Sequence, residues 1–320
     1  MTVRETFHTT DWHVAGAGVR IVESGYPSVP RMPAPEVRKL LASRWDEYRR
    51  WLMWEPWGHQ DLAGALVLEA GDEDVAATVV FLDALGYPLI DPAAALAAAG
   101  WLVSTNRVQA DRPGTVWVTL DTPGGHVPAR VEWDGNRVAS SAVAVPVSVT
   151  DEPRSVDVEG HTLRATLVRA GAALVVVDAL SLGLSGLVTE ADRARDVGKK
   201  VLEALHLPVQ DDSRVVLTTG KTPEGAWRQI VVSSDGQVDR SPGGAAVAAR
   251  VALMTRDGLQ PGVRVRFEGI LGTGLEGWWE EEAGPGGAPR TVWVAGVPWI
   301  TGYRRFFRDP DDAVMPFLVR

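Results

Sequence analysis

Short runs of apolar residues, rich in valine, isoleucine and threonine, recur along most of the chain. Turn residues separate them, as in DTPGG, EWDGN, SSDGQ and EAGPGGAP. Runs of this kind between turn residues are typical of β-strands. The pattern therefore predicts strands at 115–120, 127–133, 164–170, 172–179, 214–219, 228–234, 264–270 and 291–297.

Four segments have a helical pattern instead. Residues 35–54 and 190–205 are amphipathic and charged, whereas residues 92–99 and 244–255 are rich in alanine. The few helices interrupt many strands and do not alternate with them regularly. This arrangement predicts the α+β class and not a series of βαβ units.

The first alanine-rich segment, LIDPAAALAAAG, has a capped start and no polar face. Asp91 is a good N-cap residue, Pro92 suits the first helical position, and Gly100 is expected to end the helix. Residues 93–99 carry no charge, and a helix without a polar face is usually buried all round. Helix capping is sufficient to explain Asp91, and a place in a reaction centre is the alternative.

The second alanine-rich segment, DRSPGGAAVAARVAL, opens at Asp239, about half a chain from the first. Each segment follows a predicted strand at a turn with aspartate and proline. We interpret this as a duplication that gives two lobes, each with strands wrapped around a central small-residue helix. Two unrelated buried helices are the alternative. In the duplicated arrangement, the two helix N-termini would face one another across a cleft and suit a carboxylate ligand.

Composition limits the possible functions. The chain has 320 residues, a formal net charge of −9 and no basic block, which argues against nucleic acid as a partner. Cysteine is absent, which excludes a disulfide framework and a thiolate metal site. Without a signal-peptide core or a membrane-spanning run, we expect no membrane partner and a cytoplasmic location. The thirteen tryptophans suit an aromatic-walled cleft or a homodimer contact.

Several longer motifs identify a family. They are DWHVAGAGVRIVESGYPSVP, LMWEPWGHQDLAGALV, RQIVVSSDGQVDRSPGG, EGILGTGLEGWW and PWITGYRRFFRDPDD. In this order, and over nearly the whole chain, they resemble the proline racemase family, which also contains hydroxyproline epimerases and a 3-hydroxyproline dehydratase. The resemblance implies two lobes, residues 1–122 with 296–320 and residues 123–295. It also implies a cofactor-independent reaction on a small carboxylate-bearing cyclic imino acid held between the lobes.

The resemblance also shows where this chain departs from the family. Two family cysteines flank the substrate's α-carbon, one removing a proton and the other delivering it to the opposite face. Asp91 occupies the position of the first cysteine, and Gly243 occupies that of the second. The family's tyrosine-bearing loop is replaced by residues 166–174, and Trp57 stands where arginine is usual. Two-base racemisation of proline is therefore excluded.

Other positions of the family site persist in part. Asp239 is retained at the position that contacts the substrate's ring nitrogen, whereas the histidine that partners it is Ala93 here. In the family, backbone N–H groups after both cysteine positions bind the substrate carboxylate, and Pro92 removes one such donor. The substrate-binding positions implied by the resemblance are Ala93, Ala94, Gly243, Gly244, Ala245, His59 and Asp61.

His59 and Asp61 are expected on a strand, where a structural hydrogen bond near the cleft is their predicted role. No third ligand lies near them in the sequence, so no metal site is expected. Trp57 and Trp278 are predicted to give a flat apolar wall for a substrate larger than proline.

Two functional hypotheses follow. In the first, Asp91 shuttles a proton along one face of a pyrroline-type imino acid, giving a tautomerase or double-bond isomerase of specialised metabolism. In the second, the chain is a pseudoenzyme that binds a ligand or a protein partner. The ionisable Asp91 and the retained Asp239 favour the enzyme; the joint loss of both cysteines, the histidine and the tyrosine loop favours the pseudoenzyme.

Overall fold

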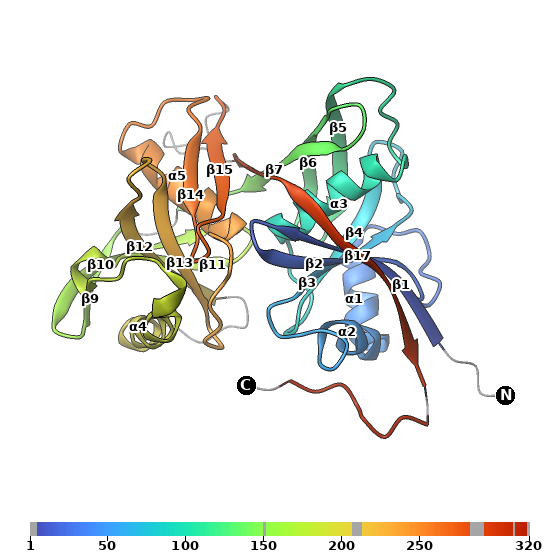
Figure 1. Ribbon diagram of the computed structural model, residues 1–320, viewed down its shortest axis with the longest axis horizontal. Helices are drawn as coiled ribbons and strands as arrows, with labels where there is room; N and C mark the ends of the chain where they lie inside the picture. The colour runs from blue at the N-terminus through green and yellow to red at the C-terminus, as the bar shows by residue number, and fades with distance from the viewer. Residues whose placement is uncertain (1–4, 150–151, 207–212, 282–290, 310, 319–320) are drawn as a thin grey trace. The chain divides into compact units, whose positions relative to one another are not determined.

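The computed structural model describes residues 5–149, 152–206, 213–281, 291–309 and 311–318. The chain divides into two compact units. Unit 1 comprises residues 1–143 and 297–320, and unit 2 comprises residues 144–296 (Figure 1). Among the described residues, no helix is long and apolar enough to span a membrane.

Unit 1 contains eight described strands in the order β17–β1–β2–β3–β4–β5–β6–β7. The strands are β1 (Glu5–Val14), β2 (Ala17–Ser24), β3 (Ala63–Leu68), β4 (Ala77–Leu82), β5 (Gly114–Thr122), β6 (Gly125–Trp133), β7 (Val138–Pro146) and β17 (Pro298–Arg308). The helices are α1 (Ala34–Arg44), α2 (Asp46–Met53) and α3 (Pro92–Ser104). The chain passes into unit 2 within β7.

Unit 2 contains a sheet with its own two α-helices, α4 (Ala191–Ala204) and α5 (Gly244–Arg256). Its strands are β8 (Ser148–Val149), β9 (Arg154–Val158), β10 (His161–Arg169), β11 (Ala173–Asp178), β12 (Ser213–Lys221), β13 (Trp227–Ser233), β14 (Val265–Glu268), β15 (Gly274–Trp279) and β16 (Thr291–Gly296). All eight strands expected from the apolar runs are present, which confirms the α+β prediction.

The two units repeat one pairing scheme. From β1 to β7, successive neighbours pair antiparallel, parallel, antiparallel, parallel, antiparallel and antiparallel. From β10 to β16 the same six directions follow in the same order. A helical connection crosses each parallel pair, with α3 and α5 in equivalent places. The duplication expected from the two alanine-rich segments is confirmed.

Helices lie on both faces of each sheet. In unit 1, α1 and α2 pack on one face through a cluster that includes Leu41, Leu52 and Leu66, and in unit 2 α4 does so through Val197, Val201 and others. The other face of each sheet curves around the alanine-rich helix. Strands β1, β2, β3, β5, β6 and β17 contact α3, and β8, β11, β15 and β16 contact α5.

Helix α3 is longer than expected, because Gly100 does not end it. The helix continues to Ser104, and Thr105 is its C-cap. A Cβ atom on Gly100 would lie 3.0 Å from Pro298 Cγ and 3.3 Å from Ser141 Oγ. The glycine therefore permits close packing of β7 and β17 against the helix, and its role is not to stop the helix.

The expected helix over residues 35–54 is two helices. Trp45 has φ −136° and ψ 24°, so it ends α1 and begins α2. The break orients Arg49, whose Nη1 donates to the carbonyl oxygens of Asp83 and Ala84, each at 2.8 Å. These contacts with a distant loop explain why an uninterrupted amphipathic pattern does not give one straight helix.

The unit boundary differs from the expected crossing after residue 122. That position lies in the turn of the β5–β6 hairpin, whose strands pair from Gly114↔Trp133 to Thr122↔Gly125. Because β6 then pairs with β7, the hairpin stays with unit 1, and the chain crosses between residues 143 and 144. The return falls between residues 296 and 297.

Arg20 is a buried cation that joins three parts of unit 1. Its side chain is 3% exposed and pairs with Asp11 through Nε at 3.0 Å and Nη2 at 2.8 Å. Its Nη1 donates to the carbonyl oxygens of Leu52 and Trp57. Arg20 therefore connects the β1–β2 hairpin to the end of α2 and to the loop that follows.

We expect Arg20→Met to lower the free energy of unfolding of unit 1 by about 3 kcal/mol, as for a broken buried ion pair. Arg304→Met is the matched control, because Arg304 also pairs with Asp11, at 2.8 Å, but is 55% exposed. The control should lose at most about 1 kcal/mol. Urea denaturation of both variants measures the difference, and equal losses would contradict a structural role for Arg20.

Candidate active site

The start of α3 is built around Asp91. Asp91 has the extended backbone of an N-cap residue, and its Oδ1 accepts a hydrogen bond from Ala94 N at 2.9 Å. The cap predicted from the sequence is confirmed. The other carboxylate oxygen, Oδ2, makes no hydrogen bond with any described residue, and Asp91 is half-buried. One oxygen thus fixes the side chain, while the second is open to a ligand.

Few backbone donors remain at this helix end. Pro92 has no N–H group, the N–H of Ala94 is bonded to Asp91, and the N–H of Ala95 donates to the Asp91 carbonyl at 2.8 Å. Among the described residues, only Ala93 N–H in this turn has no acceptor. The predicted loss of carboxylate-binding capacity at Pro92 is consistent with this geometry.

The start of α5 is different, because no side chain caps it. Gly243 is the N-cap residue, with φ 71° and ψ 112°, and its N–H donates to Ser241 Oγ at 3.0 Å. The next three N–H groups, of Gly244, Ala245 and Ala246, have no side-chain acceptor among the described residues. These residues are buried, and buried N–H groups at the positive end of a helix favour an anion.

Asp239 lies beside this helix end. Its Oδ1 accepts from Ser241 N at 2.8 Å and from Ser241 Oγ at 3.0 Å. A Cβ atom on residue 243 would lie 3.5 Å from Asp239 Oδ2. The structure therefore brings together, in unit 2, Asp239, Gly243, Gly244 and Ala245 of the predicted site.

The histidine–aspartate pair is not on a strand, so that expectation was wrong. His59 and Asp61 lie in one turn before β3, which Leu62 N closes by donating to the carbonyl of His59 at 3.1 Å. Arg20 fixes the start of this loop through the Trp57 carbonyl, at 2.9 Å. No group of three or more metal-ligating side chains occurs in the described part of the chain.

The two tryptophans have different surroundings. Trp57 is half-buried, and its ring centroid lies 4.0 Å from that of Trp51. Trp278 is 3% exposed and stacks on Trp293 at 6.1 Å, with Arg264 over its ring at 4.2 Å. Trp278 is thus a core residue of unit 2, and the predicted flat wall is not available from its ring.

The residues that support the α5 turn were not predicted from the sequence. Gln229 Nε2 donates to the Pro242 carbonyl, and Arg250 Nη1 donates to Gln229 Oε1 at 3.3 Å. Ser241 joins the carboxylate of Asp239 to the N–H of Gly243. The D-x-S spacing was a usable signal for the serine, because aspartate often accepts the N–H two residues ahead.

Comparison with known proteins identifies the family. The family model described as proline racemase matches residues 9–317. A protein of Shewanella pealeana is 31% identical, covering 96% of this chain and 93% of its own length. A proline racemase of Clostridioides difficile is 29% identical, covering 98% and 97%. This chain belongs to the proline racemase family.

A solved structure supports the fold. A hydroxyproline epimerase from Agrobacterium vitis, crystallised with trans-4-hydroxy-L-proline, superposes with a TM-score of 0.86. The match covers 98% of this chain and 96% of that chain, at 21% sequence identity. The common fold is therefore retained although the cysteines are absent.

We expect Gly243→Ala to destabilise unit 2 by more than the free-energy cost of placing alanine at a positive φ. An alanine at φ 71° costs about 1–2 kcal/mol, and its Cβ would lie 3.0 Å from Val231 Cγ2. Overpacking adds about 1–3 kcal/mol. Gly183→Ala is the matched control, because Gly183 has φ 70° with no atom within 4 Å of the added Cβ. Equal losses in urea denaturation would show that the site tolerates a side chain at residue 243.

Proposed function

We propose that this protein is a cysteine-free isomerase that moves a proton along one face of a pyrroline- or proline-type cyclic imino acid. Asp91 is the single acid–base group, and Asp239 is the partner of the ring nitrogen. The reaction is a tautomerisation or a double-bond migration, of the type needed in specialised metabolism.

The position and hydrogen bonding of the Asp91 carboxylate are the observation that supports this proposal. An ionisable side chain stands at the position of the family's first cysteine, and one of its oxygens is held by Ala94 N–H while Oδ2 has no hydrogen bond with a described residue. A carboxylate fixed in this way is positioned for proton transfer at the other oxygen. Gly243 has no acid to deliver a proton to the opposite face.

The proposed step balances with one carboxylate. Asp91 removes a proton from a ring carbon next to the imine nitrogen, and the C–H electron pair forms the new C=N bond. The π electrons of the old C=N bond move to the carbon on the other side of nitrogen. Asp91 then delivers the same proton to that carbon. Asp91 begins and ends ionised, and no redox partner is needed.

Asp239 and the open α5 turn supply binding. A carboxylate near the ring nitrogen favours its protonated form, and the C–H next to a protonated imine is more acidic than that next to a neutral one. The N–H groups of Gly244 and Ala245 are suited to the substrate carboxylate. The substrate class is supported by the relatives, which include a proline racemase and a 3-hydroxyproline 2-epimerase.

We expect no exchange of the α-proton of L-proline or trans-4-hydroxy-L-proline in deuterated buffer. The α-proton of a saturated amino acid is far less acidic than that of an imine, and residue 243 offers no second acid. Proton NMR of each amino acid with purified protein measures the exchange. Inversion with deuterium incorporation at an ordinary enzyme rate would show that other residues form the centre.

We expect Asp91→Asn to separate capping from catalysis. Asparagine caps a helix about as well as aspartate, so the free energy of unfolding should stay within about 1 kcal/mol of the parent. Turnover of a pyrroline-type substrate, first found by thermal-shift screening of cyclic imino acids, should fall by about a hundredfold or more.

Asp239→Asn is the comparison variant for this test. It should raise KM with a smaller effect on kcat, since the proposed role of Asp239 is to hold the ring nitrogen. Full activity of Asp91→Asn would leave Asp91 as a cap alone. Absence of any bound imino acid would favour the pseudoenzyme, as does the combined loss of the cysteines, the histidine and the tyrosine loop.

A further inference from the structure

Unit 2 contains a cavity of about 540 Å³ that is separate from the α5 N-terminus. It lies between the C-terminal half of α5, represented by Leu253 and Met254, and strands β10 to β14. Its volume is within the range of small-molecule sites, about 300–1,000 Å³.

The alternation of side chains along each strand determines which residues line the sheet side of the cavity. Thr166 pairs with Val176, and Asp178 pairs with Thr218, so these side chains share one face of the sheet. The residues between them, such as Val177, belong to the cluster under α4 on the opposite face. One side of the cavity is thus formed by paired strands of the sheet.

Arg250 contributes a buried cation to this cavity. Its residue is 6% exposed, and its guanidinium lies 4.9 Å from the Trp227 ring and 5.3 Å from the Phe267 ring. Its Nη1 donates to Gln229 Oε1 at 3.3 Å and to the Arg228 carbonyl at 3.5 Å. Among the described residues, no carboxylate forms an ion pair with it.

A buried guanidinium is normally paired with a carboxylate, because desolvation of an unpaired charge is costly. Burial lowers the pKa of Arg250 to about 10, so the group is still cationic at neutral pH. The long hydrogen bonds to uncharged acceptors compensate this charge only in part. The Asp178 carboxylate acts on this charge electrostatically but forms no direct ion pair with it, so an anionic group of a ligand would supply a direct partner.

The formal charges of the cavity lining sum to zero when Arg250 is included. Arg164 and Asp178 lie one residue beyond the Ala165↔Val177 pair on β10 and β11. Asp257 is the C-cap of α5, where the negative end of the helix dipole adds to its charge. Two arginines, counting Arg250, therefore face two aspartates, which suits a zwitterion better than a phosphate dianion.

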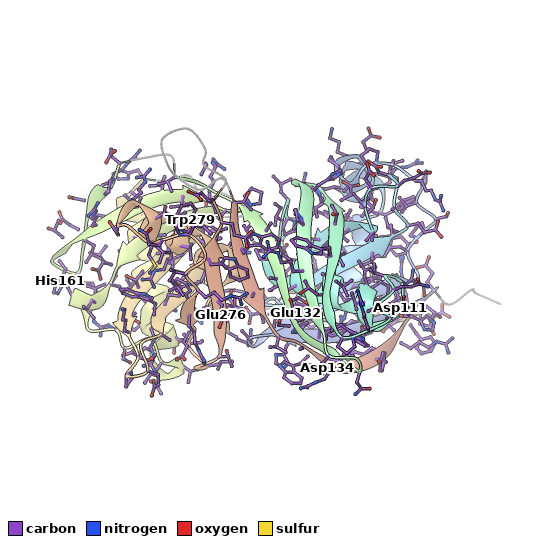
Figure 2. All side chains as sticks on the ribbon, turned by 90° about the horizontal axis from the view of Figure 1, so that it is seen from above. Asp111, Glu132, Asp134, His161, Glu276 and Trp279 are labelled. Atoms are coloured by element: carbon purple, nitrogen blue, oxygen red, sulfur yellow. The ribbon has the colours of Figure 1, made fainter. Side chains whose placement is uncertain are left out.

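Five aliphatic side chains form much of the remaining lining, and a hydrogen bond holds the turn that carries one of them. Val176, Leu253, Met254, Leu259 and Val265 contribute aliphatic surface. The turn after α5 is held because Trp279 Nε1 donates to the Leu259 carbonyl at 3.0 Å; Figure 2 labels Trp279 on β15. These side chains form one apolar wall of the cavity.

We propose that this cavity binds an α-amino acid with a large apolar side chain. The carboxylate lies at Arg250 and Arg164, the ammonium group at Asp178 and Asp257, and the side chain against the aliphatic wall. The site is independent of the reaction proposed above and would serve as an effector site.

Isothermal titration calorimetry with L-phenylalanine tests this proposal. We expect one site per chain, with much weaker binding of 3-phenylpropionate, which lacks the ammonium group, and of phenethylamine, which lacks the carboxylate. Each loss should be about tenfold or more, as for one charge-assisted interaction. Equal affinity for 3-phenylpropionate would overturn the zwitterion assignment, and absence of binding by all three would overturn the site.

Variants give a second readout. Arg164→Gln and Asp178→Asn, both at exposed residues, should each weaken L-phenylalanine binding about tenfold. Arg169→Gln is the matched control, because Arg169 is exposed on the same strand but does not line the cavity. Loss of binding in the control, or retention in both test variants, would contradict the proposal.

Asp91→Asn should bind L-phenylalanine like the parent. This separates a failure of the effector site from a failure of the proposed reaction, since the two measurements use different residues. Weakened binding in Asp91→Asn would show that the calorimetric signal comes from the catalytic site and would overturn the assignment to the cavity.

Discussion

The structure depends on two alanine-rich helices that are buried over most of their length. Residues 94–103 of α3 and 244–252 of α5 are buried without interruption, so each helix requires packing contacts on every side. A flat sheet covers only one side of a helix. The sheet of each unit therefore curves around its helix, and alanine side chains allow the strands to come close. The two units meet this packing requirement with the same order of parallel and antiparallel strand pairs.

The N-terminal ends of these two helices carry the groups of the proposed site. The two starts have diverged in a complementary way. In α3, Asp91 and Pro92 use up most of the donors and add a carboxylate. In α5, Gly243 leaves three donors open and adds no side chain. In the function proposed above, the first start exchanges a proton and the second holds an anion.

Strand positions, the α+β class and the duplication could be predicted because turn residues and apolar runs are local signals. The features that could not be predicted depend on distant partners. Gly100 was read as a helix stop, but its role is set by Pro298 and Ser141. The break at Trp45 depends on the loop that receives Arg49. For the site, the sequence gives residue types, whereas the open donors of α5 depend on backbone geometry at Gly243 and on the Ser241 hydroxyl.

The pairing of β1 with β17 has a consequence for synthesis of the chain. β1 is joined on one edge to β2, which follows it directly, and on the other to β17, which is made only after all of unit 2. Unit 2 is contiguous and can complete its sheet while unit 1 still has an open edge. An open strand edge can pair with other chains. A chain interrupted before residue 298 would therefore present β1 as a template for aggregation, even with unit 2 fully formed.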